Sequence, residues 1–409
     1  MNLEFLIIAV VKIGLLVGGV MTAAAYLVLL ERWMAAWTQD RIGPTRVGIP
    51  LTNIRLFGLG QPLADGVKMI LKEQYTPAHV DKRLFLIAPI FILAAALAIF
   101  AVIPFGSFIP PIPGWNQDKP IELVVAPGLD VGLIYVFALS SIAVYGVIVG
   151  GWASNNKYSF LGALRSSAQL IAYELPLGLG VLGVVVAGHS LRLDDLISAQ
   201  AHGQWFAFTQ PLGLIVFVIA AFAEAARLPF DLPECEQELI GGYHTEYGGL
   251  KLLLFLVAEF LHMITAAVLI VVLFFGGWHF WPLTGEGNDV TWVTAILRII
   301  VLNVKVLGVV VFFMLVRWSW PRFRFDQLMA LAWKIMLPLG LANLVAVAVI
   351  EEVKRGYGDQ FTPAIQYACI AVAWAVCAAG WIVVAYAGPL VTDNRARRVV
   401  HSYEVETTS

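Results

Sequence analysis

The chain has 409 residues, of which 60% are hydrophobic and only 13% are charged. A soluble domain cannot bury that much apolar surface, so the composition excludes an ordinary water-soluble protein and predicts an all-α, polytopic membrane protein. The formal net charge of −2 is uninformative, because the distribution of the charges matters more. We expect no nucleic-acid partner.

Nine apolar runs follow one another along the chain, and we predict that each crosses the membrane as a helix. They cover roughly residues 4–30, 84–109, 130–152, 167–188, 211–226, 250–276, 291–316, 328–350 and 363–389. A crossing helix needs about 20 apolar residues to span ~30 Å of hydrocarbon. The expected fold is therefore a helical bundle that forms one transmembrane domain over 1–390, followed by a short polar tail at 391–409.

The loops between these spans share Lys and Arg unevenly. With the N-terminus outside, most of the bases fall in the inside loops 31–83, 153–166, 227–249 and 317–327. The outside loops then hold only Lys119, Arg192, Lys354 and Arg355. Because cytoplasmic loops are the ones enriched in Lys and Arg, we predict an outside N-terminus and an inside C-terminus.

The first inside loop is too long for a plain connector and contains the segment P-L-A-D-G-V-K-M-I-L-K-E. Its first residue, Pro62, suits a first helical position. Leu63, Val67, Ile70 and Leu71 then fall on one helical face. We predict a short amphipathic helix that lies at the membrane interface or against the bundle.

Three carboxylates lie within or at the end of predicted spans. By helix rise, Glu174 and Glu259 lie roughly 10–14 Å below the inside ends of their spans, and Glu224 ends the fifth span. An acid at such depth must face water or a partner, so we predict a buried, hydrated proton path through the three. The structural alternative is that each acid is neutralised by a base such as Lys305 or Lys334.

The segment from Glu224 to Tyr247 is strongly acidic and lies between two apolar runs. Its loop acids are Asp231, Glu234, Glu236, Glu238 and Glu246. Such crowding makes the pKa values interdependent and favours proton handling, cation binding or the docking of a basic partner. The alternative is a solvated acidic loop, although the interleaved Pro and Phe residues favour a packed segment.

Arginines are frequent on the predicted inside face: Arg32, Arg41, Arg46, Arg227, Arg317, Arg322 and Arg324. Each of them has a simple role as an anchor for lipid headgroups, but together they could line a cavity that attracts an electronegative headgroup. We expect His262 and Cys235 to be structural. The cysteines Cys235, Cys369 and Cys377 have no metal-binding spacing, so we expect no metal site and place any redox centre on other chains.

Several motifs together resemble the membrane-embedded quinone-site subunit of respiratory complex I, called the H subunit in bacteria and subunit 1 in mitochondria. The matching stretches are E-R at 31–32, R-I-G-P at 41–44, L-G-Q-P-L-A-D-G-V-K at 59–68, G-W-A-S-N-N-K-Y at 151–158, A-Q-L-I-A-Y-E at 168–174, the acidic segment 227–247 and R-W-S-W-P-R-F-R-F-D-Q-L-M at 317–329. The resemblance extends from the first span to the eighth and depends on no single motif.

The resemblance implies a chamber in which ubiquinone or menaquinone takes electrons from the terminal iron–sulfur cluster of a neighbouring subunit. The chamber would include Glu31, Arg32, Arg41, Asp65, Arg227, Arg317 and Arg322. Proton coupling would run through Asp231, Glu234, Glu236, Glu238, Glu224, Glu174 and Glu259. The partners would be lipid, antiporter-like membrane subunits and the redox-arm subunits that carry NAD, FMN and the iron–sulfur clusters, in the bacterial inner membrane.

Two positions depart from the family pattern. The usual E-R-K reads E-R-W here, which places Trp33 where the family has a base, and the usual E-T-N-R reads E-A-A-R, which replaces an asparagine by Ala226. The ninth span and the tail have no implied role. Two other functions stay open: the equivalent subunit of a membrane-bound hydrogenase or formate hydrogenlyase, and a stand-alone proton-coupled secondary transporter, which the lack of inverted repeats disfavours.

Overall fold

The computed structural model describes residues 3–48, 55, 57–111, 120–231, 240–285, 291–358 and 362–391. The elements up to the middle of the chain are α1 (Leu3–Thr38), α2 (Gln61–Leu71), α3 (Lys82–Ile99), β1 (Phe108–Ile109), β2 (Ile121–Glu122), α4 (Gly132–Ala153), α5 (Lys157–Gly188), α6 (Leu193–His202), α7 (Phe206–Thr209) and α8 (Pro211–Glu224). The remaining elements are η2 (Gly242–His244), α10 (Gly249–Phe274), α11 (Trp281–Thr284), α12 (Trp292–Ser319), α13 (Phe325–Ala330), the π-helical η3 (Leu331–Met336), α14 (Leu337–Tyr357) and α15 (Pro363–Val391). The described residues confirm the all-α class, with one short antiparallel pair, β1 and β2.

Eight helices in the described part of the chain are long and apolar enough to cross a membrane, as expected of a multi-pass membrane protein. They are α1, α3, α4, α5, α10, α12, the segment Phe325–Tyr357 and α15. The fifth predicted span is shorter than expected. It corresponds to α8, which has 14 residues and is therefore about 21 Å long. The helix is short because it begins at Pro211 and ends before Ala226, a residue with positive φ.

The link between α4 and α5 is much shorter than the predicted inside loop 153–166. Only residues 154–156 separate the two helices, and the side chain of Asn156 accepts a hydrogen bond from the Tyr158 N–H, which caps α5. The first turns of α5 therefore occupy most of the predicted loop.

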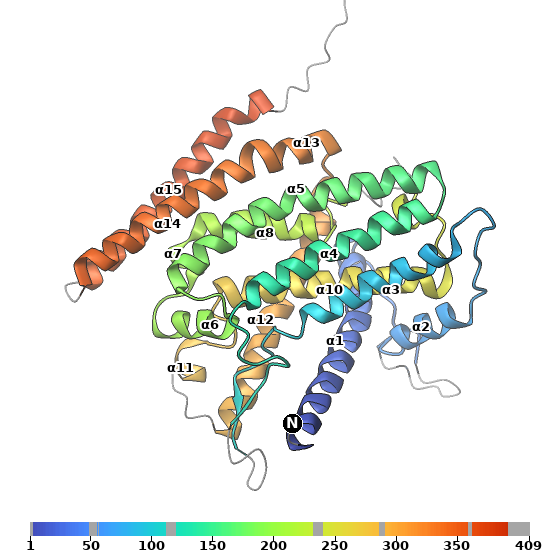
Figure 1. The fold of residues 1–409 in the computed structure, drawn as a ribbon, viewed down its shortest axis with the longest axis horizontal. Coiled ribbons are helices and arrows are strands. Elements are labelled where there is room, and N and C mark those ends of the chain that lie inside the picture. Colours follow the sequence, from blue (N-terminus) through green and yellow to red (C-terminus); the bar gives the residue numbers. More distant parts are fainter. Residues whose placement is uncertain are drawn as a thin grey trace, which may run out of the picture.

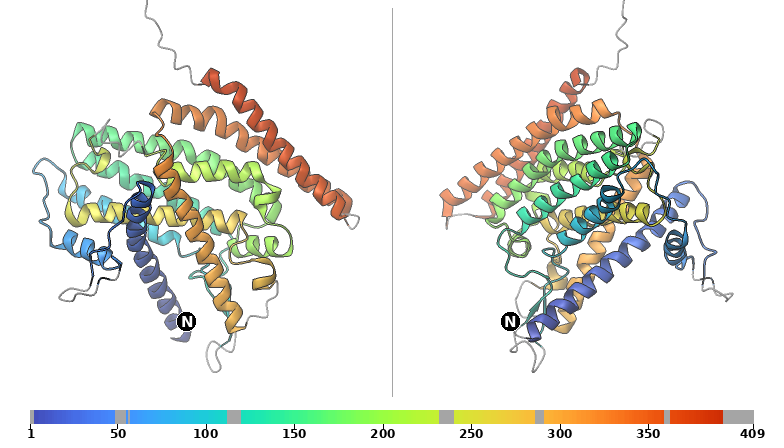
Figure 2. Two further views of the ribbon diagram at one scale, coloured as in Figure 1. Left: turned by 180° about the vertical axis from the view of Figure 1, so that it is seen from behind. Right: turned by 45° about the vertical axis from the view of Figure 1, so that its right-hand side comes forward.

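The long helices α3, α4, α5, α10 and α14 run in similar directions, whereas α1 and α12 cross them steeply (Figure 1). Seen from behind, α1 and α12 lie next to each other, and α2 lies beside the C-terminal part of α1 (Figure 2). The ends of α1, α8 and α12 thereby come together with α10, although they are far apart in the sequence.

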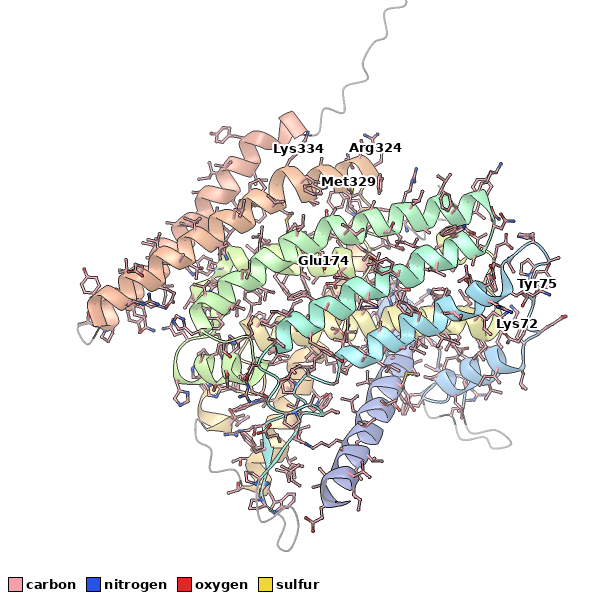
Figure 3. The ribbon with its side chains drawn as sticks, in the orientation of Figure 1. Lys72, Tyr75, Glu174, Arg324, Met329 and Lys334 are labelled. Carbon is pink, nitrogen blue, oxygen red and sulfur yellow. The ribbon has the colours of Figure 1, made fainter. Side chains whose placement is uncertain are left out.

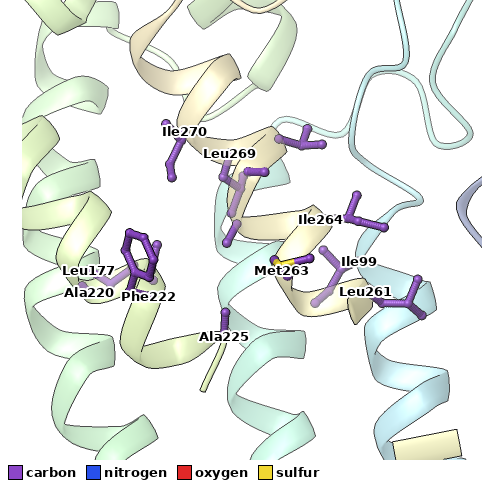
Figure 4. Packing of buried hydrophobic residues seen from close by; sticks show 14 of the residues in the cluster. Ile99, Leu177, Ala220, Phe222, Ala225, Leu261, Met263, Ile264, Leu269 and Ile270 are labelled. Atoms are coloured by element: carbon purple, nitrogen blue, oxygen red, sulfur yellow. The ribbon is translucent and has the colours of Figure 1, made fainter. Parts of the chain in front are cut away.

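The central helix is α10, which contacts α1, α3, α5, α8 and α12. Every residue from 263 to 274 is buried, and side chains of α10 stand between Ile99 of α3 and Phe222 of α8 (Figure 4). Lipid tails are as apolar as these side chains, so close packing rather than water exclusion favours the bundle. The packing therefore fixes the positions of the polar side chains on α10 relative to α3 on one side and α8 on the other.

Small residues let α4 approach its neighbours closely. A Cβ on Gly151 would lie 2.3 Å from the Ala163 Cβ of α5, and one on Gly146 would lie 3.0 Å from the Ile92 Cβ of α3. Larger residues at these positions would separate the helices, which is the reason that small residues are favoured at membrane-helix interfaces.

The predicted amphipathic helix is confirmed by α2, which places Pro62 in its first turn. None of its residues is buried, and Leu63, Val67, Ile70 and Leu71 are exposed on its apolar face. At the other end of the chain, α15 packs along α14 and touches α7 and α8. Most of its large side chains are exposed, whereas Ala373 and Cys377 are buried.

Candidate functional site

An ion pair joins the end of α1 to the amphipathic helix α2. Arg32 Nη1 lies 2.7 Å from Asp65 Oδ2, and Gln61 Nε2 donates to Asp65 Oδ1 at 3.0 Å. The E-R and Q-P-L-A-D motifs therefore meet in space and hold α2 against the bundle.

Arg227, just after α8, is the centre of a buried series of charges. Its Nε lies 3.0 Å from Glu259 Oε1 on α10, and its Nη1 lies 3.5 Å from Glu31 Oε2 on α1. Glu31 also accepts a hydrogen bond from Arg317 at the end of α12. Arg227 is 5% exposed, with its guanidinium 4.4 Å from the Phe260 ring centroid. Opposite charges thus alternate along the series, which is the arrangement that buried charges require.

The start of the acidic loop is packed rather than solvated. The Phe230 ring stacks on the Phe323 ring with centroids 5.5 Å apart, and the Phe323 N–H donates to the Pro229 carbonyl at 3.2 Å. Gln169 Nε2 donates to the carbonyls of Phe230, at 2.8 Å, and Ala223, at 2.9 Å. The motifs around 168–174, 227–231 and 317–329 are therefore parts of one packed unit.

Asp231 lies at the edge of this unit, with its Oδ2 3.7 Å from Arg322 Nη2. Burial, reinforced by the negative charge of Glu259, raises the pKa of Asp231 to about 7, while nearby Arg317, Arg322 and Arg227 act in the opposite direction. Asp231 therefore titrates near neutral pH. The other acids of this predicted cluster, Glu234, Glu236 and Glu238, lie outside the described residues.

The far end of the loop is fastened to the cap of α5. Asn156 Nδ2 donates to Glu246 Oε1 at 2.6 Å. His244 in η2 is half-buried, and the desolvation of its ring lowers its pKa to about 4 and keeps the imidazole neutral. Both ends of the acidic segment are thus fixed to the bundle.

A cavity of about 700 Å³ opens beside the series of charges, and we call it the large cavity. It is lined by Val28, Glu31, Arg32, Ala35, Arg41, Ile42, Gly43, Pro44, Arg227, Leu256, Glu259, Phe260, Arg317 and Trp318. Five of the seven residues that the sequence assigns to a chamber line it. Of the other two, Asp65 pairs with the lining residue Arg32, and Arg322 pairs with Asp231.

A second, smaller cavity of about 60 Å³ lies deeper in the bundle, and we call it the small cavity. It is lined by Ile92, Ser140, Ser141, Ala143, Val144, Val147, Ser166, Leu170, Glu174, Glu224, Ala225, Ala226, Tyr243, Phe255, Glu259 and His262. Glu224 accepts a hydrogen bond from Ser140 and Glu174 accepts one from Ser141. Glu174 points from α5 toward α4 (Figure 3). The three acids predicted to form a proton path therefore share one cavity.

Glu259 lines both cavities. Its carboxylate pairs with Arg227 in the large cavity, and it is close enough to the small cavity to form part of its wall. Of the candidate residues that the structure describes, only Glu259 has this double position.

Comparison with known proteins identifies the family. A family model described as NADH dehydrogenase matches residues 11–348. The chain is 45% identical over 339 residues to a Geobacter metallireducens protein named as an H subunit of NADH-quinone oxidoreductase, covering 83% of this chain and 95% of the relative. It is 43% identical over 327 residues to a Protochlamydia amoebophila protein that is also named as the H subunit of NADH-quinone oxidoreductase, covering 80% and 92%. The chain belongs to the NADH dehydrogenase family.

The first departure from the pattern of the NADH dehydrogenase family supports the wall of the large cavity. Trp33 Nε1 donates to the Pro44 carbonyl at 3.2 Å, and its ring stacks on Trp37. A Cβ on Gly43 would lie only 2.5 Å from the Trp33 ring, so the R-I-G-P segment sits directly on the indole. Trp33 therefore replaces a base by a packed support.

The second departure lies on the small cavity. Ala226 has a φ of +48°, in the left-handed region that asparagine and glycine adopt more readily than alanine. The asparagine of the family pattern would relieve that strain and add a polar group to the lining. Its absence leaves the small cavity with fewer polar side chains on the α8 side.

The bases that the structural alternative invoked do not neutralise the acids. Lys305 donates to the carbonyls of Phe275, Gly277 and His279 beyond the opposite end of α10. Lys334 is exposed at the edge of the bundle, away from Glu174 (Figure 3). The base that faces Glu259 is instead Arg227.

Sequence reasoning missed Ser140 and Ser141, and it expected His262, which also lines the small cavity, to be structural. The two serines lie in an apolar run where nothing in their spacing marks a site, but His262 is three residues after Glu259 on one helix, a spacing that signals a shared face. Cys369 and Cys377 are free cysteines, whereas Cys235 lies outside the described residues.

Proposed function

We propose that this chain is a subunit of proton-pumping NADH:quinone oxidoreductase, complex I, which forms much of the quinone chamber and couples quinone reduction to proton movement. The relatives at 43–45% identity are named as the H subunit of NADH-quinone oxidoreductase. Their names favour complex I over the related hydrogenases and over a stand-alone transporter. NAD, FMN and the iron–sulfur clusters would then belong to partner subunits of the redox arm, and antiporter-like subunits would continue the membrane arm.

The large cavity has the size and lining that a quinone headgroup requires. Its volume of about 700 Å³ lies within the ~300–1,000 Å³ typical of small-molecule sites. Val28, Leu256 and Phe260 offer apolar walls, while Arg227 and Arg317 offer donors to quinone oxygens. Ubiquinone and menaquinone both match this chemistry.

The position of Glu259 in both cavities carries the proposal. Reduction of a quinone to a quinol takes up two electrons and two protons, and negative charge that develops beside Arg227 raises the proton affinity of nearby carboxylates. Glu31 and Glu259 both line the large cavity and pair with Arg227, and Asp231 lies near the same group of arginines. Glu259 also lines the small cavity with Glu174 and Glu224, which supports a proton path from the chamber into the bundle.

The proposed orientation places the N-terminus outside and the C-terminus inside the bacterial inner membrane. It requires an odd number of crossings, so the short helix α8 must count as a crossing. A topology reporter fused after Ser409 is expected to report a cytoplasmic location. A periplasmic signal there would mean that α8 does not cross.

The proposal is tested by Glu259→Gln in the assembled complex, reconstituted in liposomes. Gln keeps the size of the side chain but cannot exchange a proton. We expect NADH-driven, quinone-dependent proton pumping to fall by at least about tenfold, while electron transfer to artificial acceptors upstream of the quinone is unchanged. The matched control is Glu352→Gln, whose carboxylate is 75% exposed at the end of α14. Normal pumping by an assembled Glu259→Gln complex would refute the coupling role.

A further inference from the structure

His262 shares a helix face with the residue that joins the two cavities. It lies three residues after Glu259 on α10, and both side chains line the small cavity. No protein group in the described part of the chain makes a hydrogen bond to the His262 ring, so both ring nitrogens are available to the cavity.

The other polar groups around His262 come from several of the elements packed on this cavity. Glu174 comes from α5, Glu224 from α8, Tyr243 from η2, and the Ser140 and Ser141 hydroxyls from α4, while α3 contributes an apolar residue. Among the described lining residues none is Lys or Arg. His262 is therefore the one imidazole in a described lining that otherwise offers carboxyls, hydroxyls and a phenol.

Glu259 alone is poorly suited to pass protons onward, because its ion pair with Arg227 holds it toward the large cavity. An imidazole can accept a proton at one ring nitrogen and release another from the second. The cavity volume of about 60 Å³ also exceeds the ~10–15 Å³ that one water needs, so water can complete the hydrogen bonds.

We propose that His262 relays protons between Glu259 and the pair Glu174 and Glu224, an inference that rests on the proposed function. A proton leaves the Glu259 carboxyl and binds one ring nitrogen of His262. The proton on the other ring nitrogen then passes to the Glu174 or Glu224 carboxylate, directly or through water. Only O–H and N–H bonds form and break, no electron moves, and the ring is left as its other neutral tautomer.

The test is His262→Asn in the assembled complex in liposomes, measured from pH 6 to pH 8. Asn keeps a polar side chain of similar reach but does not titrate. We expect quinone-dependent proton pumping to fall by at least about tenfold, less than the ~10²–10⁴-fold of many acid–base groups because water offers a slower route. We also expect a flatter pH profile than that of the unmodified complex, which a purely structural histidine would not cause.

His202→Asn is the matched control, because His202 is an exposed histidine at the end of α6, away from the small cavity. Normal pumping and a normal pH profile in His262→Asn, with Glu259→Gln impaired, overturn the relay and leave the proposed function standing. Normal behaviour of both variants overturns both. If His262→Asn does not assemble, His262→Gln takes its place, and failure of both to assemble shows that the ring is structural and overturns the relay.

Discussion

The two cavities that share Glu259 accommodate buried carboxylates in different ways. In the large cavity the acids face arginines, since Glu31 pairs with Arg317 and Arg227, and Glu259 pairs with Arg227. In the small cavity Glu174 and Glu224 accept hydrogen bonds from serine hydroxyls.

The difference affects how readily each acid takes up a proton before any charge develops on a ligand. A guanidinium only donates, so an acid beside it is stabilised in its ionised form. A hydroxyl both donates and accepts, so an acid beside it keeps its hydrogen bond whether or not it is protonated. The large cavity is therefore suited to holding fixed charge around a polar ligand, and the small cavity is suited to moving protons.

Removal of the central arginine should have the largest effect on this arrangement. Arg227→Gln leaves Glu31 and Glu259 without their shared partner in a buried site, which costs about 3–5 kcal/mol when one member of a buried pair is lost. We expect a loss of assembled complex, or a clear fall in its thermal stability. The control is Arg324→Gln, because Arg324 pairs with Asp326 at a site more than 60% exposed, and exposed surface pairs contribute little to stability. Equal stability of the two variants would contradict a central role for Arg227.

Removal of the hydroxyls should impair the small cavity alone. In the double variant Ser140→Ala and Ser141→Ala, the Glu224 and Glu174 carboxylates lose hydrogen bonds worth about 1.5–3 kcal/mol each. We expect proton pumping in the assembled complex to fall about tenfold while quinone still binds. Ser167→Ala is the control, since Ser167 donates only to the Leu164 carbonyl within α5. A pumping defect of the same size in the control would show that the loss of any buried hydroxyl is enough to impair proton pumping.

Much of the fold follows from the sequence, because long apolar runs leave a chain few options but helices that cross a membrane. The start of α5 and the shortness of α8 did not follow. Residues 157–166 are mixed in polarity, and only the Asn156 cap and the close packing at Gly151 extend the helix there. The end of α8 depends on the backbone conformation at Ala226, which composition does not reveal.

The candidate site was predicted as a set of acids and arginines but not as a set of pairs. The structural alternative offered a base such as Lys305 or Lys334 for each buried acid, whereas the structure places Arg227 beside Glu259, because the chain after α8 turns back against α10. Ser140 and Ser141 were not predicted as site residues, because a serine in an apolar run shows no periodic signal. The meeting of distant motifs depends on tertiary packing, which a single sequence does not show.

The loop acid Asp231 predicts that the rate of quinone reduction beside the large cavity depends on pH. Its pKa is raised to about 7, so Asp231 holds a proton below pH 7 and loses it above pH 7. If Asp231 donates that proton during quinone reduction, the reaction should become slower as the pH rises through 7. We expect Asp231→Asn to reduce the rate a few-fold at pH 6 and to change it little at pH 8, so that the slope between them largely disappears. Rates measured across pH 6–8 in the assembled complex check this, and an unchanged slope would assign the titration to another group.

The smallest expected effect concerns the wall of the large cavity. Trp33→Phe keeps the aromatic support beneath Gly43 but removes the hydrogen bond to the Pro44 carbonyl, a loss of about 0.5–1.5 kcal/mol. Since the R-I-G-P segment lines only the large cavity, the weaker wall should raise the KM for quinone roughly two- to tenfold and leave proton pumping per electron unchanged. Trp37→Phe is the control, because Trp37 is 60% exposed and lines neither cavity. A change in pumping per electron without a change in KM would mean that this wall acts on the proton path, and that the two cavities do not divide binding from proton transfer.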